Sequence, residues 1–132
     1  MGYENIICGV DGSDTSMAAL REASRLAGSE GAHLTVLYAQ REDSEHVASA
    51  DSGEDVLERA LSVARKEDIE PDTRLEHGDP SEVLIDVADK VGADLLVVGN
   101  KGMTGVQRFL LGSVPNKVSH HAPCDLLIVK TT

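Results

Sequence analysis

The chain has 132 residues, of which 41% are hydrophobic and 2% aromatic, and this predicts one domain over residues 1–132 with an aliphatic core. It carries 12 Lys and Arg against 23 Asp and Glu, and its formal net charge of -11 disfavours nucleic acid and anionic membrane surfaces as partners. No apolar run approaches the roughly 18 residues of a membrane span and no leader pattern is visible, so we expect a cytoplasmic protein. The acidity is also compatible with a salt-adapted, halophilic source.

In the first half of the chain, short aliphatic runs alternate with longer amphipathic ones. Residues 5–10 and 33–39 are predicted strands, and the helix between them has apolar residues every three or four positions and ends near Gly28 or Gly31. Residues 40–53 show neither the helical nor the strand spacing of apolar residues and are predicted to form a loop. Ser52 begins the next helix, which is predicted to run to about residue 67.

The same alternation continues in the second half of the chain, with a weakly patterned strand that we expect at a sheet edge. The predicted elements are a strand at 73–76, a helix from Asp79-Pro80 to Gly92, a central strand at 94–99, a short helix at 114–121 and a last strand at 125–130. Five strands and four helices in strict alternation predict an α/β fold with a doubly wound parallel sheet.

Candidate ligand-binding residues follow two of the predicted strands. Ligands of open parallel sheets bind outside the carboxyl ends of the strands, where the winding reverses. Asp11 follows the first strand and Gly99 ends the fourth, so both face one crevice if these strands are neighbours. Gly99, Gly102 and Gly112, followed by Ser113, would let backbone NH groups and a helix N-terminus approach phosphate oxygens. The spacing differs from that of a Walker loop.

The charge pattern around this loop also favours an anionic ligand. The thirty residues from 95 to 124 contain no Asp or Glu, whereas simple proportion predicts about five, and they contain Lys101, Arg108 and Lys117. The alternative explanation is that strand and loop residues in a core are apolar in any case. Asp11 also has two interpretations, as a turn or helix-cap residue and as a carboxylate that accepts hydrogen bonds from ribose hydroxyls.

No catalytic or metal-binding constellation is apparent in the sequence. Cys8 and Cys124 are expected to be buried free thiols, and the five histidines are not spaced as a triad or metal cage. A divalent ion would therefore arrive with phosphates.

Taken together, these residues resemble the universal stress protein family. The ATP-binding branch of that family carries Gly, two residues, Gly, nine residues, Gly and then Ser or Thr, and Gly99, Gly102, Gly112 and Ser113 match this pattern. The resemblance runs from the opening IICGVDGSDTS to the closing HAPCDLLIVK. It implies a sheet of order 3-2-1-4-5, the Rossmann-like sandwich of the adenine nucleotide alpha hydrolases, and a homodimer formed through the last strand.

The resemblance also implies a function and a set of binding residues. The function is that of an ATP-binding, stress-response or regulatory module, with ADP or AMP as other ligands, Mg²⁺ accompanying the phosphates, and a regulatory protein as a further partner. The implied nucleotide contacts are Asp11 at the ribose, Val10 and Ala39 at the adenine, Val98, Gly99, Asn100, Lys101, Gly102, Met103 and Thr104 around the ribose and phosphates, and Gly112, Ser113 and Val114 at the phosphates.

Two departures from the family pattern and two other functions bear on this expectation. Pro115 has no NH where relatives often have a small hydroxyl residue, and Asn100 replaces the commoner Ser, which makes ADP or AMP credible ligands. Because no positioned general base is visible, we expect at most slow ATP hydrolysis or self-phosphorylation at Ser113 or Thr104. The alternatives are a nucleotide-free dimeric scaffold and a small ATP-hydrolysing or AMP-forming enzyme of the adenine nucleotide alpha hydrolase group.

Overall fold

The computed structural model describes residues 2–41, 52–100 and 113–130. In chain order, the elements within these ranges are β1 (Asn5–Val10), α1 (Asp14–Glu30), β2 (His33–Gln40), α2 (Gly53–Arg65), β3 (Asp72–His77), α3 (Pro80–Val91), β4 (Leu95–Gly99), α4 (Ser113–His121) and β5 (Asp125–Val129). The strands form one parallel sheet of order β3-β2-β1-β4-β5, which confirms the predicted fold class and strand order.

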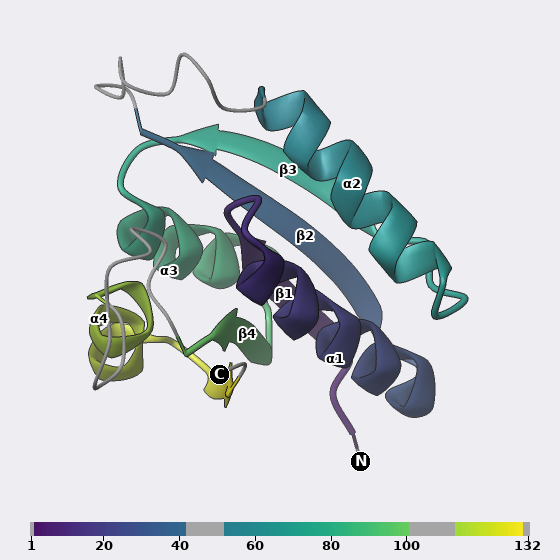
Figure 1. Ribbon diagram of the computed structural model, residues 1–132. Coiled ribbons are helices and arrows are strands. Elements are labelled where there is room, and N and C mark those ends of the chain that lie inside the picture. Colours follow the sequence, from purple (N-terminus) through teal and green to yellow (C-terminus); the bar gives the residue numbers. More distant parts are fainter. Residues whose placement is uncertain (1, 42–51, 101–112, 131–132) are drawn as a thin grey trace.

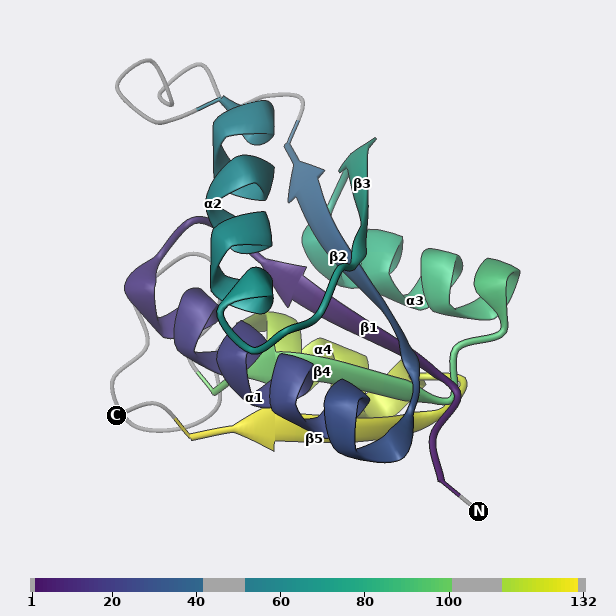
Figure 2. The same ribbon diagram turned by 90° about the vertical axis from the view of Figure 1, so that its right-hand side faces the viewer.

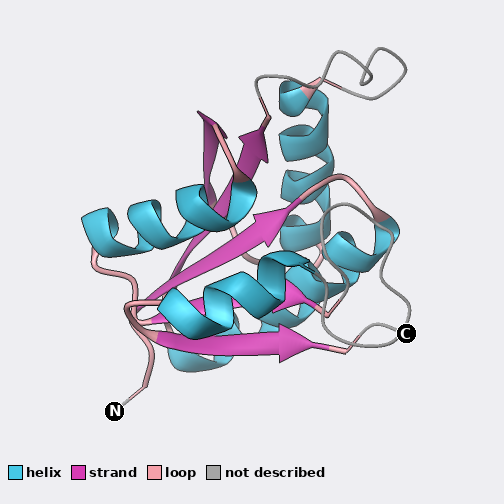
Figure 3. Cartoon of the chain, turned by 90° about the vertical axis from the view of Figure 1, so that its left-hand side faces the viewer, coloured by secondary structure: helices cyan, strands magenta, loops and turns pink. Residues whose placement is uncertain are grey.

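Two helices cover each face of this sheet (Figure 1). In Figure 2, α1 and α2 lie in front of the strands, and in Figure 3, which shows the opposite side, α3 and α4 lie in front. Each layer encloses its own aliphatic core: Cys8, Leu20 and Val36 belong to the first, and Leu37 and Leu96 to the second. Branched and small side chains fill both layers, as the low aromatic content predicts.

Polar side chains begin three of the helices, and the sequence singles out two of them, Ser52 and Asp79. The Oγ of Ser13 accepts a hydrogen bond from the Ser16 NH at the start of α1, and Ser52 forms a capping box with Asp55 at the start of α2. The Asp79 carboxylate caps α3. Each cap satisfies an NH group that has no partner inside its helix, so these positions fix where the helices begin.

The helix ends differ slightly from the pattern in the sequence. α1 continues through Gly28 and stops at Glu30, because Gly31 takes the left-handed conformation with φ 67°. α2 ends at Arg65, with Lys66 as its C-cap, slightly before the expected end near residue 67. These shifts of one or two residues leave the order and the type of the elements unchanged.

The two edges of the sheet differ in chemistry. β3 lies at one edge, as expected, and its Asp72, Arg74 and Glu76 alternate with less polar residues. β5, with the sequence DLLIV, lies at the other edge, and its Leu127 side chain is 38% exposed. Within the described ranges, no helix is both long and apolar enough to cross a membrane.

Candidate functional site

The winding of the sheet reverses between β1 and β4. The chain moves from β1 to β2 and β3 through α1 and α2 on one face, and then crosses to β4 and β5 with α3 and α4 on the other (Figure 1). β1 and β4 are parallel neighbours, with Cys8 opposite Val97. Their carboxyl ends therefore lie side by side, and Asp11 and Gly99 meet at one crevice as the sequence predicts.

The turn after β1 is held by a compact set of hydrogen bonds around Asp11. The Oδ1 atom of Asp11 accepts hydrogen bonds from the Ser13 NH at 2.9 Å and the Ser13 Oγ at 2.6 Å. The Asp11 NH donates to the Oγ of Ser16 at 3.2 Å. Among the described residues, the second carboxylate oxygen, Oδ2, has no hydrogen-bond partner. Asp11 is half-buried, so the turn presents one open acceptor at the crevice.

The end of β4 closes against the first turn of α1. A Cβ atom on Gly99 would lie 3.6 Å from the Thr15 carbonyl oxygen and 3.9 Å from the Ala19 Cβ, so β4 and α1 are packed closely there. The backbone NH of Asn100 donates to the Val129 carbonyl at 2.9 Å, which holds the strand's exit beside β5. Because of this packing, the start of α1 lines one side of the crevice through Thr15 and Ser16.

A small cavity of about 10 Å³ lies between these parts and α4. Its lining consists of Gly9, Asp11, Ser13, Thr15, Ser16, Val98, Gly99, Val114 and Pro115. This volume is close to the least that holds one water molecule. The cavity is therefore too small to enclose a nucleotide, and its lining includes Asp11, Val98, Gly99 and Val114 of the predicted site.

The structure brings together about half of the residues that the sequence predicts. Val10 is the last residue of β1 and Ala39 the last but one of the adjacent strand β2, Val10 pairs with Tyr38, and both Val10 and Ala39 are buried. Burial, followed by the charge of Asp11, raises the pKa of the neighbouring Tyr38 hydroxyl. Asp11, Val98, Gly99 and Val114 line the cavity itself.

Several of the predicted contacts lie outside the described residues. These are Lys101, Gly102, Met103, Thr104 and Gly112. Ser113 begins α4, but its side chain also lies outside the described part of the structure. Asn100 is described and follows β4 directly.

Lys117, which the sequence assigns to a positive region around the loop, is compensated by acidic groups. Its Nζ lies 3.6 Å from Glu82 Oε2 and 4.0 Å from Asp79 Oδ2, and Arg41 Nη1 lies 3.4 Å from Asp79 Oδ1. The pKa of Asp79 is lowered mainly by the hydrogen bond from the Ser81 hydroxyl, with smaller effects of the Glu82 NH and the two cations. Lys117 thus connects α4 to the start of α3, and Lys101 and Arg108 lie outside the described residues.

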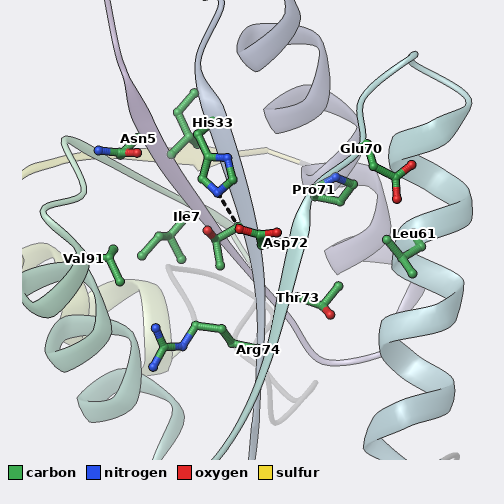
Figure 4. A pocket seen from close by; sticks show the side chains of 12 residues that line it. Asn5, Ile7, His33, Leu61, Glu70, Pro71, Asp72, Thr73, Arg74 and Val91 are labelled. Carbon is green, nitrogen blue, oxygen red and sulfur yellow. Dashed lines mark ion pairs between the residues drawn. The ribbon is translucent and has the colours of Figure 1, made fainter.

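A larger hollow of about 630 Å³ lies at the opposite end of the strands (Figure 4). Its charged side chains are engaged with one another or with near neighbours: His33 Nε2 lies 2.9 Å from Asp72 Oδ2, and Arg74 Nη2 lies 3.0 Å from Glu76 Oε2. Arg65 binds Glu70 on its rim and lowers the pKa of that carboxyl through a hydrogen bond. The larger volume of this hollow does not make it the better candidate site. Its charged side chains already have partners, whereas Asp11, at the carboxyl ends of the strands, has an oxygen without a partner among the described residues.

The two cysteine thiols, Cys8 and Cys124, differ in how deeply they are buried. Cys8 is fully buried as expected, and burial raises its pKa to about 12, which makes it unreactive. The prediction that Cys124 is buried is wrong: it is only partly buried, because it precedes the edge strand β5. Burial and the nearby charge of Asp125 raise the pKa of Cys124 as well. Both thiols are free.

Sequence reasoning missed two kinds of residue at this site. Thr15 and Ser16 line the cavity, and the run of hydroxyl residues after Gly12 was the available signal for them. Arg59 of α2 donates hydrogen bonds to the Gly12 carbonyl at 2.6 Å and to Asp14 Oδ1 at 2.9 Å. No sequence signal exists for Arg59, because it contacts residues 45 and 47 positions away.

Comparison with known proteins identifies the family. The family model described as "Universal stress protein family" matches residues 2–130. A universal stress protein of Mycobacterium tuberculosis is 36% identical over 144 residues, with 98% of each chain covered. A universal stress protein solved in complex with cAMP is 34% identical, with a TM-score of 0.81 and full coverage of both chains. A universal stress protein from Archaeoglobus fulgidus in complex with dAMP is 26% identical, with a TM-score of 0.76 over 98% of this chain and all of the other. The chain therefore belongs to the universal stress protein family.

Proposed function

We propose that this protein binds an adenine nucleotide in the crevice between β1 and β4 and serves as a nucleotide-dependent regulatory module of the stress response. The observation that carries the proposal is the half-buried Asp11 carboxylate, which lines the same cavity as Gly99, is fixed through Oδ1 and has no partner for Oδ2 among the described residues. Solved relatives in complex with cAMP and dAMP support an adenine nucleotide as the ligand class. ATP is the ligand that we favour, because the full glycine signature is present.

Each part of the crevice has a role in this proposal. Asp11 accepts hydrogen bonds from the ribose hydroxyls through its open oxygen. The adenine lies over the ends of β1 and β2, where Val10 contributes backbone contacts because its side chain is 0% exposed, and Ala39 contributes packing. These contacts involve adenosine alone, so they are shared by every adenine nucleotide.

The phosphates are assigned to the second half of the crevice. Gly99, Asn100, Lys101, Gly102, Met103 and Thr104 surround them, and Gly112, Ser113 and Val114 approach from the start of α4. The unpaired NH groups and the dipole at a helix N-terminus favour an anion there. Pro115 lies in the first turn of α4 and has no NH to donate, so one contact to the terminal phosphate is missing, and ADP and AMP are the other candidate ligands. We propose that Mg²⁺ enters bound to the phosphates rather than to a cage of protein ligands.

The same crevice argues for binding rather than rapid catalysis. The hydroxyls of Ser13 and Ser16 are both engaged in the turn, since Ser13 Oγ donates to Asp11 and Ser16 Oγ donates to the Ser13 carbonyl at 3.0 Å. Neither is therefore placed as a nucleophile, and Asp11 is committed to the ribose. In this proposal any hydrolysis or self-phosphorylation is slow.

We propose further that two copies of the chain pair through β5. An exposed apolar edge strand is open to pairing, whereas charged side chains protect an edge. Each edge strand carries an exposed leucine, Leu127 on β5 and Leu75 on β3, but on β3 the ion-paired Arg74 and Glu76 flank that leucine. A two-fold axis would set the two β5 strands antiparallel and continue the sheet across the dimer.

Isothermal titration with ATP, AMP, adenosine and GTP tests the proposed ligand. We expect all three adenine compounds to bind and GTP to bind far more weakly, because the guanine edge presents a different set of donors and acceptors. Equal affinity for ATP and GTP would refute adenine recognition. A protein that binds none of the four, with or without Mg²⁺, would favour the nucleotide-free scaffold.

A further inference from the structure

Arg59 connects α2 to the turn that carries Asp11. Its Nη1 donates to the Gly12 carbonyl at 2.6 Å, and its Nη2 donates to Asp14 Oδ1 at 2.9 Å. Gly12 has φ 89°, so this peptide lies in a conformation that other residues rarely adopt. The turn therefore depends on contacts that keep it in one shape.

The remaining hydrogen bonds of the turn come from the turn itself or from the start of α1. Asp11, Ser13 and Ser16 bind one another, and Ser13 also contacts Thr15. Among the described residues, Arg59 is the side chain from another element that donates hydrogen bonds to this turn. Its contact thus connects the turn to α2 by hydrogen bonds.

The two bonds of Arg59 differ in expected strength. Asp14 is 99% exposed, and an ion pair in water contributes little. The bond to the Gly12 carbonyl also lies at the surface, but its acceptor belongs to a half-buried residue, and a charged donor at 2.6 Å makes a stronger bond than a neutral one. The Gly12 contact is therefore where Arg59 acts.

We infer that Arg59 is a positioning residue for the ribose contact. It holds the Gly12 peptide so that the open oxygen of Asp11 faces the crevice, and it touches neither ribose nor phosphate itself. This inference rests on the proposed function. Loss of the contact would let the turn sample other shapes and lower the affinity for adenosine and for ATP by the same factor.

The test is a double-mutant cycle with Arg59→Gln and Asp11→Asn, read as dissociation constants for adenosine and ATP. Arg59→Gln is expected to weaken both ligands roughly 2- to 30-fold, the range for residues that act without touching the ligand. In the Asp11→Asn background the same change is expected to have little further effect, because the positioned group is already lost.

Two matched variants separate positioning from other roles. Arg65→Gln removes the ion pair with Glu70 at 2.7 Å on the same helix and should leave both affinities unchanged. Asp14→Ala removes the second hydrogen-bond acceptor of Arg59 and should also leave both affinities unchanged. Arg59→Lys retains a charged donor and should recover part of the lost affinity, and it serves as the test variant if Arg59→Gln does not fold.

Several outcomes would overturn the inference. A larger loss for ATP than for adenosine would make Arg59 a phosphate contact, and additive losses in the double mutant would disconnect it from Asp11. If the parent protein binds and Asp11→Asn weakens binding while Arg59→Gln does not, the positioning role alone fails. If the parent protein binds neither adenosine nor ATP, the proposed function fails and the positioning role fails with it.

Discussion

Substitution of Asp11 by Asn tests the ribose contact with little disturbance to the turn. The Asn side chain keeps an Oδ1 atom that can accept from the Ser13 NH and the Ser13 Oγ, now at 2.9 and 2.6 Å from the carboxylate. It replaces the open Oδ2 with an NH₂ group, which cannot accept a hydrogen bond. The variant thus removes the proposed ribose acceptor and leaves the internal acceptor in place.

The expected size of the effect follows from the charge of the lost group. A hydrogen bond to a charged acceptor contributes about 1.5–3 kcal/mol, which corresponds to an affinity loss of about 10- to 150-fold. The cost to stability is smaller, because the turn keeps its bonds and loses only a negative charge near the start of α1. That charge contributes about 0.3–1 kcal/mol through the helix dipole.

Affinities measured by titration calorimetry for ATP and for its 2′,3′-dideoxy analogue would decide the assignment. If Asp11 binds the ribose hydroxyls, Asp11→Asn weakens ATP strongly and changes the dideoxy analogue little, since that analogue has no hydroxyl to lose. Urea unfolding of the same variant checks that the fold is retained. Equal losses for both ligands would show that Asp11 does not contact the hydroxyls and would refute the assignment.

The remaining predictions concern the turn at Gly12, the stability of the fold at low pH and the β5 edge of the sheet. Gly12→Ala forces a side chain into φ 89°, with its Cβ 3.2 Å from Val56 Cγ2, so we expect urea unfolding to show a loss of about 1–2 kcal/mol. Because the folded pKa of Asp79 is lowered, its ionised form stabilises the fold above the ordinary value of 3.8, and this stability is lost as pH falls through the folded pKa. In Asp79→Asn, the free energy of unfolding should therefore depend less steeply on pH below 3.8 than in the parent protein. The same slope in both proteins would contradict this. Leu127→Lys should give a monomer in light scattering, whereas Leu75→Lys, at the similarly exposed edge of β3, should not; two monomers or two dimers would refute pairing through β5.

The fold was predictable because its signals are local. Aliphatic runs bounded by Gly and Asp defined the strands, and Ser52 and Asp79 marked the helix starts through hydrogen bonds made within three residues. The weak strand at β3 was also recognised, because an edge strand alternates charged and apolar residues. The bounds of several strands and helices shifted by one or two residues. For the end of α1 the sequence was ambiguous, because Gly28 and Gly31 are equally good signals.

The site was predictable only in part, because some of the contacts around it join residues that are far apart in the sequence. Asp11 and Gly99 follow their strands directly, and the reversal of winding brings them together. The contact from Arg59 depends on how α2 packs over α1, and no spacing rule encodes it. The pairing of Lys117 with Asp79 and Glu82 was missed for the same reason, and so a charge census assigned that lysine to the loop.

The most direct test of adenine nucleotide binding is to purify the protein in molar KCl, denature it, and identify the released small molecules by chromatography and mass spectrometry. We expect ATP, ADP or AMP in stoichiometric amount, and the number of phosphates on the released nucleotide would show whether the start of α4 contacts the phosphates. A protein that releases nothing and also fails to bind added ATP with Mg²⁺ would refute adenine nucleotide binding in the crevice.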